Sequence, residues 1–149
     1  DRGSTDGFRY DASFTFPTGV ASSLADSSRN VYVADSYNNK IRKIDRYRNV
    51  TTLAGSGAEG SQDGPGTAAS FYMPFGVAVD SSGNVYVADT YNHSIRKIDP
   101  SGNVSTLAGS GSEGSTDGNG TSATFHSPRG VAVDSSGIVY VADTDNHMI

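Results

Sequence analysis

The sequence predicts an all-β fold built from a repeated four-stranded sheet, and three observations support this prediction. The same segments recur at a fixed interval of 54 residues along the 149-residue chain. Each repeat contains short runs rich in β-branched and aromatic residues, separated by residues that favour turns. Glycine is abundant, with 18 residues, whereas only 35% of the chain is hydrophobic. This combination indicates many short strands joined by turns rather than a bundle of helices.

The repeats align over most of the chain. The segment Val-Tyr-Val-Ala-Asp ends at Asp35 and again, after each further 54 residues, at Asp89 and Asp143. Ile-Arg-Lys-Ile-Asp occurs at residues 41–45 and 95–99. A spacer containing Gly-Ser-x-Asp-Gly precedes each unit and ends in Phe-x-x-Pro-x-Gly. The phenylalanines of these spacers are Phe14, Phe71 and Phe125. Because such self-similarity marks a repeat architecture, it decides the fold before any local pattern does.

Each unit contains four predicted strands, which in the second unit cover residues 76–80, 85–88, 94–98 and 104–108. The intervening segments begin with Asp and supply Asx turns or a positive φ. The first two strands are apolar on both faces, since Val85 and Val87 alternate with Tyr86 and Ala88. A sheet that is buried on both faces must lie between neighbouring sheets. A radial array of blades, the β-propeller, provides this arrangement, and the far shorter coils of a parallel β-helix disfavour that alternative.

Residues 74–98 carry a family resemblance. They read Pro-x-Gly-Val-Ala-Val-Asp-Ser-Ser-Gly-Asn-Val-Tyr-Val-Ala-Asp-Thr-Tyr-Asn-His-Ser-Ile-Arg-Lys-Ile, which resembles an NHL repeat, with His93 in the slot that gives the family part of its name. The resemblance implies four-stranded antiparallel blades. Two departures stand out. The spacing of 54 exceeds the blade length of roughly 40–45 residues in ordinary propellers. The first unit also has three extra residues between Gly19 and Asp26, where we expect a bulge or a widened turn.

We expect residues 1–149 to form one partial NHL propeller. Its blade units cover approximately residues 17–56, 74–110 and 128–149, joined by Gly/Ser-rich spacers, and the third unit is incomplete because Ile149 aligns with Ile95. The chain would then hold about two and a half to three blades of a ring of about six. The incomplete third unit would expose an unpaired strand edge beside apolar surface, and native proteins pair or cover such edges. Further blades of a longer chain, or neighbouring copies, would complete such a ring.

Composition narrows the classes of partner. The formal charge of −5 and the pI near 4.9 disfavour a nucleic-acid partner, and the strongly basic face of RNA-binding NHL proteins is not evident. Cysteine is absent, which excludes disulfides and thiolate metal sites. The sequence contains no apolar run approaching 18 residues, so we expect no membrane insertion.

The candidate binding surface is the face that carries the longest loops. In an antiparallel blade, the turn between strands two and three emerges on the same face as the spacer between blades. This face varies most between units, and binding residues concentrate on such loops. Asp and Asn at these positions are expected to hold their own turns, whereas tyrosine favours interfaces. The predicted partner-binding residues are Tyr37, Asn39, Tyr91, His93, Asp145 and His147.

We predict no catalytic residue, no metal site and no cofactor in this chain. His93 and His147 occupy equivalent slots on neighbouring blades, and His126 takes a slot that is not chemically uniform between units. No histidine–carboxylate set with metal-ligand spacing is evident. The Asp-Gly-x-Gly segments at residues 63–66 and 117–120 favour tight turns over calcium loops, because each offers one carboxylate. Arg-Lys pairs at 42–43 and 96–97 form a small basic stripe on the outer third strand, and we expect them to pair with Asp45, Asp99 and neighbouring acids rather than to bind phosphate.

The functional expectation is a non-catalytic binding or structural scaffold that mediates protein–protein or glycan interactions within a larger extracellular or surface protein. Four segments fit the N-glycosylation pattern, at Asn49, Asn92, Asn103 and Asn119. The alternative is a fragment of a propeller lyase or hydrolase whose metal site lies in other blades. The NHL resemblance includes such enzymes, so the choice rests on the residues that the fold brings together.

Overall fold

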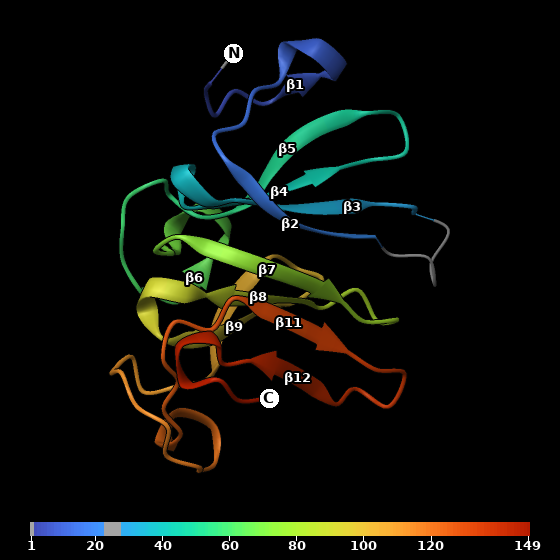
Figure 1. Ribbon diagram of the computed structural model, residues 1–149. Helices are drawn as coiled ribbons and strands as arrows, with labels where there is room; N and C mark the ends of the chain where they lie inside the picture. The colour runs from blue at the N-terminus through green and yellow to red at the C-terminus, as the bar shows by residue number, and fades with distance from the viewer. Residues whose placement is uncertain (1, 23–27) are drawn as a thin grey trace.

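The structure, a computed structural model, describes residues 2–22 and 28–149 as three antiparallel sheets (Figure 1). Blade 1 consists of β2 (Pro17–Ser22), β3 (Val31–Asp35), β4 (Lys40–Ile44) and β5 (Asn49–Ala54), with β1 (Gly7–Phe8) at its outer edge. Blade 2 consists of β7 (Pro74–Val79), β8 (Val85–Asp89), β9 (Ser94–Ile98) and β10 (Asn103–Ala108), with β6 (Gly64–Pro65) at its outer edge. The third unit contains β11 (Gly130–Val133) and β12 (Val139–Ala142).

Short 3-10 turns accompany the strands. In each unit one such turn follows the second strand. These are η2 (Ser36–Asn38), η4 (Thr90–Asn92) and η6 (Thr144–Asn146). The others lie in the spacers: η1 (Arg9–Asp11), η3 (Gly66–Ala68) and η5 (Gly120–Ser122). Among the described residues, no helix has the length and apolar character needed to cross a membrane.

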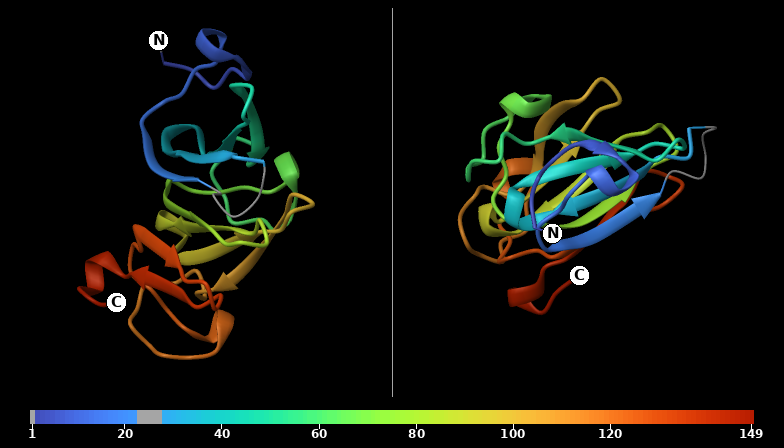
Figure 2. Two further views of the ribbon diagram at one scale, coloured as in Figure 1. Left: turned by 90° about the vertical axis from the view of Figure 1, so that its right-hand side faces the viewer. Right: turned by 90° about the horizontal axis from the view of Figure 1, so that it is seen from above.

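The sheets follow one another like the blades of a fan (Figure 2), and the predicted four-stranded antiparallel blade is confirmed. Each full blade also has a fifth strand of two residues, which the sequence analysis did not predict. β1 pairs with β5, and β6 pairs with β10. The spacer therefore runs along the outer edge of the blade that follows it before it returns to the inner strand. The bulge predicted between Gly19 and Asp26 falls largely on residues 23–27, outside the described part of the chain.

The hydrophobic core fills the space between blades 1 and 2. It combines side chains of β3, β4 and β5 with those of β8 and with Phe71 from the spacer, which is fully buried. All five residues of β8 are buried, as the apolar pattern on both of its faces predicts. Burial on both faces means that each sheet gains its stability from its neighbours.

One buried arginine forms a polar centre at the outer half of each full blade: Arg42 in blade 1 and Arg96 in blade 2. Arg96 of β9 is fully buried and donates to the carboxylates of Asp89 at 2.7 Å and Asp63 at 2.6 Å. It also donates to the backbone carbonyls of Ser70 and Gln62, each at 3.1 Å. In blade 1, Arg42 makes the equivalent four bonds, with Asp35, Asp6, Ser13 and Thr5 as acceptors.

Both arginines therefore pair with neighbouring acids, as predicted, but neither pairs with Asp45 or Asp99, and both are buried rather than part of a basic stripe on the outer strand. The spacer covers this face of the sheet and supplies one carboxylate, and the end of the second strand supplies the other. Burial raises the pKa of Asp89 to about 6, while bonds from Asn92 and the Tyr72 amide and the charge of Arg96 act in the opposite direction. The carboxyl with the raised pKa thus belongs to a structural ion pair. Removal of either Asp89 or Arg96 would leave the other charge buried without its partner.

Neighbouring blades approach each other through glycine. A Cβ atom on Gly19 would lie 2.2 Å from the Phe75 carbonyl oxygen, and one on Gly76 would lie 2.5 Å from the Arg129 carbonyl oxygen. The inner strands therefore touch backbone to backbone. A side-chain hydroxyl also joins the second and third units, since Thr90 Oγ1 of η4 donates to the Pro128 carbonyl at 2.7 Å. These contacts fix the angle between blades and so the position of every loop on the propeller face.

Candidate binding face

The face that carries η2, η4 and η6 is held by a repeated set of polar contacts, and we call it the turn face. The Asn92 amide donates to the Asp89 carboxylate and to the Gly60 carbonyl of the spacer, both at 2.7 Å. Asn38 and Asn146 make the equivalent pairs of bonds in their units. The asparagine thus ties the turn to the spacer, so its chemistry serves the scaffold, as the sequence analysis expected for Asp and Asn.

The residue after each turn joins one unit to the next. Asn39, His93 and His147 all adopt the left-handed conformation, with φ of 50°, 48° and 57°. The Asn39 side-chain oxygen accepts a bond from the Met73 amide at 2.9 Å, and His93 Nδ1 accepts one from the Ser127 amide at 3.1 Å. Two of the predicted binding residues, Asn39 and His93, therefore use a side-chain atom to hold the next blade, and His147 lies exposed at the equivalent position.

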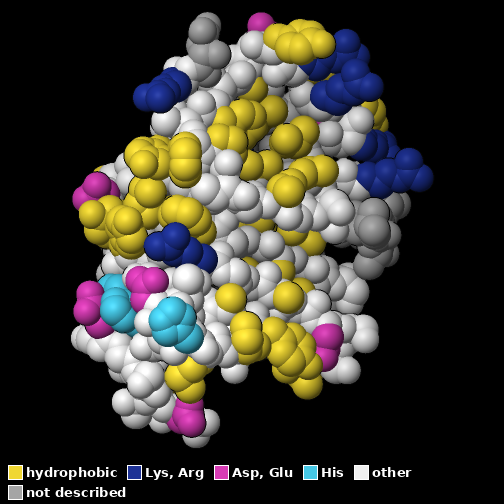
Figure 3. Space-filling model, in the orientation of Figure 1, with side chains coloured by type: hydrophobic (Ala, Val, Ile, Leu, Met, Phe, Trp, Pro, Cys, Tyr) yellow, Lys and Arg dark blue, Asp and Glu magenta, His cyan; other side chains and the backbone are white. Residues whose placement is uncertain are grey.

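The tips of the three turns carry the exposed side chains of this face. Tyr37 is 58% exposed and packs edge-on against Phe16, with ring centroids 4.9 Å apart. Tyr91 is 46% exposed and makes the same type of contact with Tyr72 at 5.1 Å. In the third unit the tip is Asp145. Figure 3 shows hydrophobic side chains and histidine rings gathered along this flank of the molecule.

Sequence reasoning identified the tips but missed their partners Phe16, Tyr72 and His126. Phe16 lies one position, and Tyr72 and His126 lie two positions, before the proline that precedes or opens an inner strand. The signal was available in the alignment of the units, because these spacer positions vary while Phe-x-x-Pro around them does not. What the alignment does not show is that the spacer folds back beside the turn, where the Tyr91 amide donates to the Tyr72 carbonyl at 3.2 Å.

His93 and His126 come together between the second and third units, although sequence reasoning treated them separately. Their ring centroids are 5.8 Å apart, and each Nε2 lies 3.8 Å from the Glu113 carboxylate. Since the Ser127 amide donates to Nδ1 of His93, the neutral ring carries its proton on Nε2, which is then a donor and not a metal ligand. In the described part of the chain, no group of three or more His, Cys, Asp or Glu residues could hold a metal ion.

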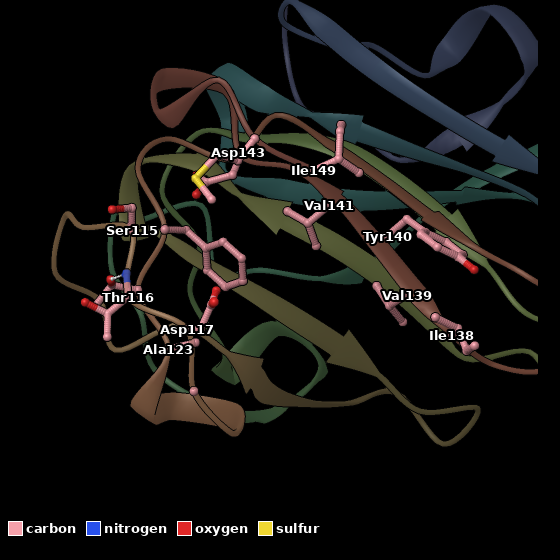
Figure 4. A pocket seen from close by; sticks show the side chains of 14 residues that line it. Ser115, Thr116, Asp117, Ala123, Ile138, Val139, Tyr140, Val141, Asp143 and Ile149 are labelled. Carbon is pink, nitrogen blue, oxygen red and sulfur yellow. Dashed lines mark hydrogen bonds between the residues drawn. The ribbon is translucent and has the colours of Figure 1, made fainter.

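A pocket of about 680 Å³ lies on the third unit (Figure 4). It is lined by Asp117, Asp143 and Phe125 together with side chains of β12. The equivalents of these three residues in blade 2 are Asp63, Asp89 and Phe71, which surround the guanidinium of Arg96. The pocket is therefore the third unit's counterpart of a structural arginine site, and we do not assign it a ligand.

The four predicted glycosylation sites differ in how their side chains are engaged. The amides of Asn49 and Asn103 donate to the carboxylates of Asp45 and Asp99 within their turns, each at 3.0 Å. Asn92 holds the turn face, as described above. Asn119 precedes η5 and is exposed. Attachment of a glycan at Asn92 would remove one of the two N–H groups that make these bonds, and so at least one bond of the scaffold.

Comparison with known proteins agrees with this geometry. The NHL repeat profile matches residues 71–98 and 125–149. The protein SUPPRESSOR OF QUENCHING 1, chloroplastic, of Arabidopsis thaliana is 35% identical over 147 residues, which cover 92% of this chain and 14% of that protein. NHL repeat-containing protein 2 of Homo sapiens is 35% identical over 154 residues, covering 95% of this chain and 21% of that protein. The chain thus spans about a fifth or less of the length of these relatives.

Solved structures share the fold. A protein of unknown function from Bacteroides thetaiotaomicron superposes with a TM-score of 0.77 at 29% identity, over 91% of this chain and 35% of that one. An auxiliary nutrient binding protein from the same organism gives 0.72 at 26% identity, over 80% and 33%. A gluconolactonase from Xanthomonas campestris gives 0.61 at 17% identity, over 86% and 35%, which shows the fold alone.

Repeated antiparallel blades, joined through glycine contacts and presenting equivalent turns on one face, define a β-propeller repeat protein. The chain belongs to the NHL-repeat family.

Proposed function

We propose that this chain is a non-catalytic binding module whose turn face holds a protein partner. One observation carries the proposal. The turn tips place exposed aromatic side chains, Tyr37 and Tyr91, on a backbone that is fixed by buried ion pairs and interblade bonds. Rigid tyrosines supply large contact area at low cost in conformational entropy, and they are enriched among residues that dominate binding energy.

The variation between units supports this reading. Bonds of Asn38, Asn92 and Asn146 recur in every unit, whereas the tips change from Tyr37 and Tyr91 to Asp145. The hydrogen bonds that hold each turn are thus the same in every unit, whereas the exposed residue at the turn differs. Variation confined to exposed loop residues is typical of a binding surface. A nutrient binding protein shares the fold, which agrees with a binding role, and the fold is also shared by a gluconolactonase.

Selection of a random peptide library on the immobilised chain tests the proposal. We expect enriched peptides whose affinity falls at least ~10-fold for the double variant Tyr37→Ala, Tyr91→Ala, a loss of about 1.4 kcal/mol or more. The control variant Leu107→Ala, Ile138→Ala removes two other exposed apolar side chains and should leave binding unchanged. Peptides that bind the tyrosine variant as tightly as the parent chain would overturn the proposal. A glycan array probed with the same proteins tests a carbohydrate partner.

We further propose that the protein acts outside the cell or at its surface. The support is the placement of Asn49 and Asn103 at the start of the fourth strand of each full blade, where both are at least partly open to solvent. Surface biotinylation of the full-length protein in its own cells measures this directly, and a mass decrease on treatment with an N-glycosidase would accompany it. A protein that resists biotinylation in intact cells and shows no such decrease would place the module inside.

A further inference from the structure

Blade 1 carries a dense basic region on the side opposite the turn face. Eight of the eleven Lys and Arg residues lie within residues 1–48. Of these, Arg9, Arg29, Arg46 and Arg48 are exposed around one end of the blade, and Lys and Arg side chains gather there in Figure 3. The pairing of Val31 with Ile44 brings the start of β3 beside the end of β4, and the Arg9 amide donates to the Arg48 carbonyl at 3.0 Å.

Three exposed aromatic residues lie among these arginines. Phe8 is 47% exposed, Tyr10 98% and Tyr47 61%. We call Phe8, Arg9, Tyr10, Arg29, Arg46, Tyr47 and Arg48 the basic–aromatic surface. The equivalents of these seven in blade 2 are Pro65, Gly66, Thr67, Gly83, Pro100, Ser101 and Gly102, which are neither charged nor aromatic. The surface is thus specific to blade 1, although the underlying turns are shared.

Backbone conformation distinguishes three of the arginines. Arg9, Arg29 and Arg48 have φ of 53°, 50° and 72°, in the left-handed region that disfavours residues with a Cβ atom. The other units place glycine at these positions, also with positive φ: Gly66 and Gly120, Gly83 and Gly137, and Gly102. Arginine here strains the backbone without serving the fold, because glycine builds the same turns elsewhere in the chain. Strain that is retained at exposed charged residues points to function.

The guanidinium groups are presented in a way that suits carboxylates. Arg9 lies over the Phe8 ring at 4.9 Å and Arg46 over the Tyr47 ring at 4.7 Å. A stacked guanidinium presents its planar N–H edge to a bidentate anion, although in Arg46 one Nη2 hydrogen is donated to the Tyr47 hydroxyl. The ring partner is covered and therefore less open to a nucleic-acid base. The nearest acidic group of the turn, Asp45, already accepts bonds from the Tyr47 and Asn49 amides.

We propose that the basic–aromatic surface binds an acidic, Asp/Glu-rich segment of a protein partner. Charge distribution selects this class over nucleic acid. Residues 49–149 carry three Lys or Arg against ten Asp or Glu. A long polyanion would meet this acidic remainder of the molecule, whereas a short acidic segment is confined to the basic end within a screening length of roughly 8–10 Å.

Fluorescence anisotropy on the full 149-residue chain at low ionic strength tests the proposal. The probes are a short labelled peptide of alternating Glu and Gly, the same peptide with Gln in place of Glu, and a labelled oligouridylate of similar length. We expect the Glu peptide to bind, the Gln peptide not to bind, and the Glu complex to weaken with added salt.

The decisive variant is Arg9→Gly, Arg29→Gly, Arg48→Gly, which restores the residue type of the other units. We expect at least ~10-fold weaker binding of the Glu peptide and an unchanged or raised melting temperature. The control Arg2→Ala, Lys97→Ala, Arg129→Ala removes the same charge elsewhere and should weaken binding less than ~2-fold. Equal losses in both variants would reduce the effect to net charge and overturn the proposal. Tighter, arginine-dependent binding of the oligouridylate would overturn it in favour of nucleic acid.

Discussion

At Arg48 the main chain adopts φ 72°, and at the equivalent Gly102 it adopts φ 89°. The same turn is therefore built once with arginine and once with glycine. A left-handed residue with a Cβ atom costs about 1–2 kcal/mol, whereas glycine loses only about 0.4–1 kcal/mol through the greater freedom of the unfolded chain. The balance at this single position favours glycine.

We therefore predict that Arg48→Gly raises the free energy of unfolding by on the order of 0.5 kcal/mol, and that Gly102→Arg lowers it by a similar amount. Urea denaturation of the two variants measures both changes against the parent chain. A loss of stability in Arg48→Gly would mean that the arginine side chain makes a structural contact, and the strain argument for the basic–aromatic surface would fail at that residue.

At the scale of the element, the two-residue strand β6 and the Asp63 just before it close the outer edge of blade 2. Partial burial raises the pKa of the Asp63 carboxyl, but hydrogen bonds from Arg96 and Thr106 outweigh this effect and leave the pKa below its ordinary value of 3.8. A depressed pKa means that the folded state holds the charged form more strongly than the unfolded state does. Its stabilising contribution is present above about pH 4 and is lost as pH falls through the folded pKa.

We expect Asp63→Asn to melt at a lower temperature than the parent chain at pH 7, with the gap narrowing as the pH is lowered to about 3. Circular dichroism melts across this pH range provide the measurement. Asp11→Asn, at an exposed acid outside blade 2, is the matched control and should show little gap at any pH. A gap for Asp63→Asn that stays constant with pH would show that the hydrogen bonds act independently of charge.

For the molecule as a whole, the repeat was sufficient to predict the blades, the faces on which loops emerge, and the turn roles of Asn38 and Asn92. It was insufficient for the path of the spacer. Gly64 and Pro65 form a strand only because β10 offers a free edge, and nothing in their local propensity indicates this. The burial of Arg42 and Arg96 escaped prediction for the same reason, since the covering segment is the spacer. The contacts of Tyr72 with Tyr91 and of His126 with Asp145 also could not be predicted, because they too depend on the path of the spacer.

The pairing of β6 with β10 also sets where one unit of the chain ends and the next begins. A block that runs from Gly55 to Ala108 contains Arg96 together with all four of its acceptors: Gln62, Asp63, Ser70 and Asp89. A block cut at Pro74, where the inner strand starts, would separate the guanidinium from three of them. Duplication or transfer of the block that begins at Gly55 moves the arginine together with all of its acceptors. Such a block needs neighbouring blades only to cover its apolar faces. The number of blades in such a protein can then change by insertion of whole blocks of this kind without leaving a buried arginine unpaired.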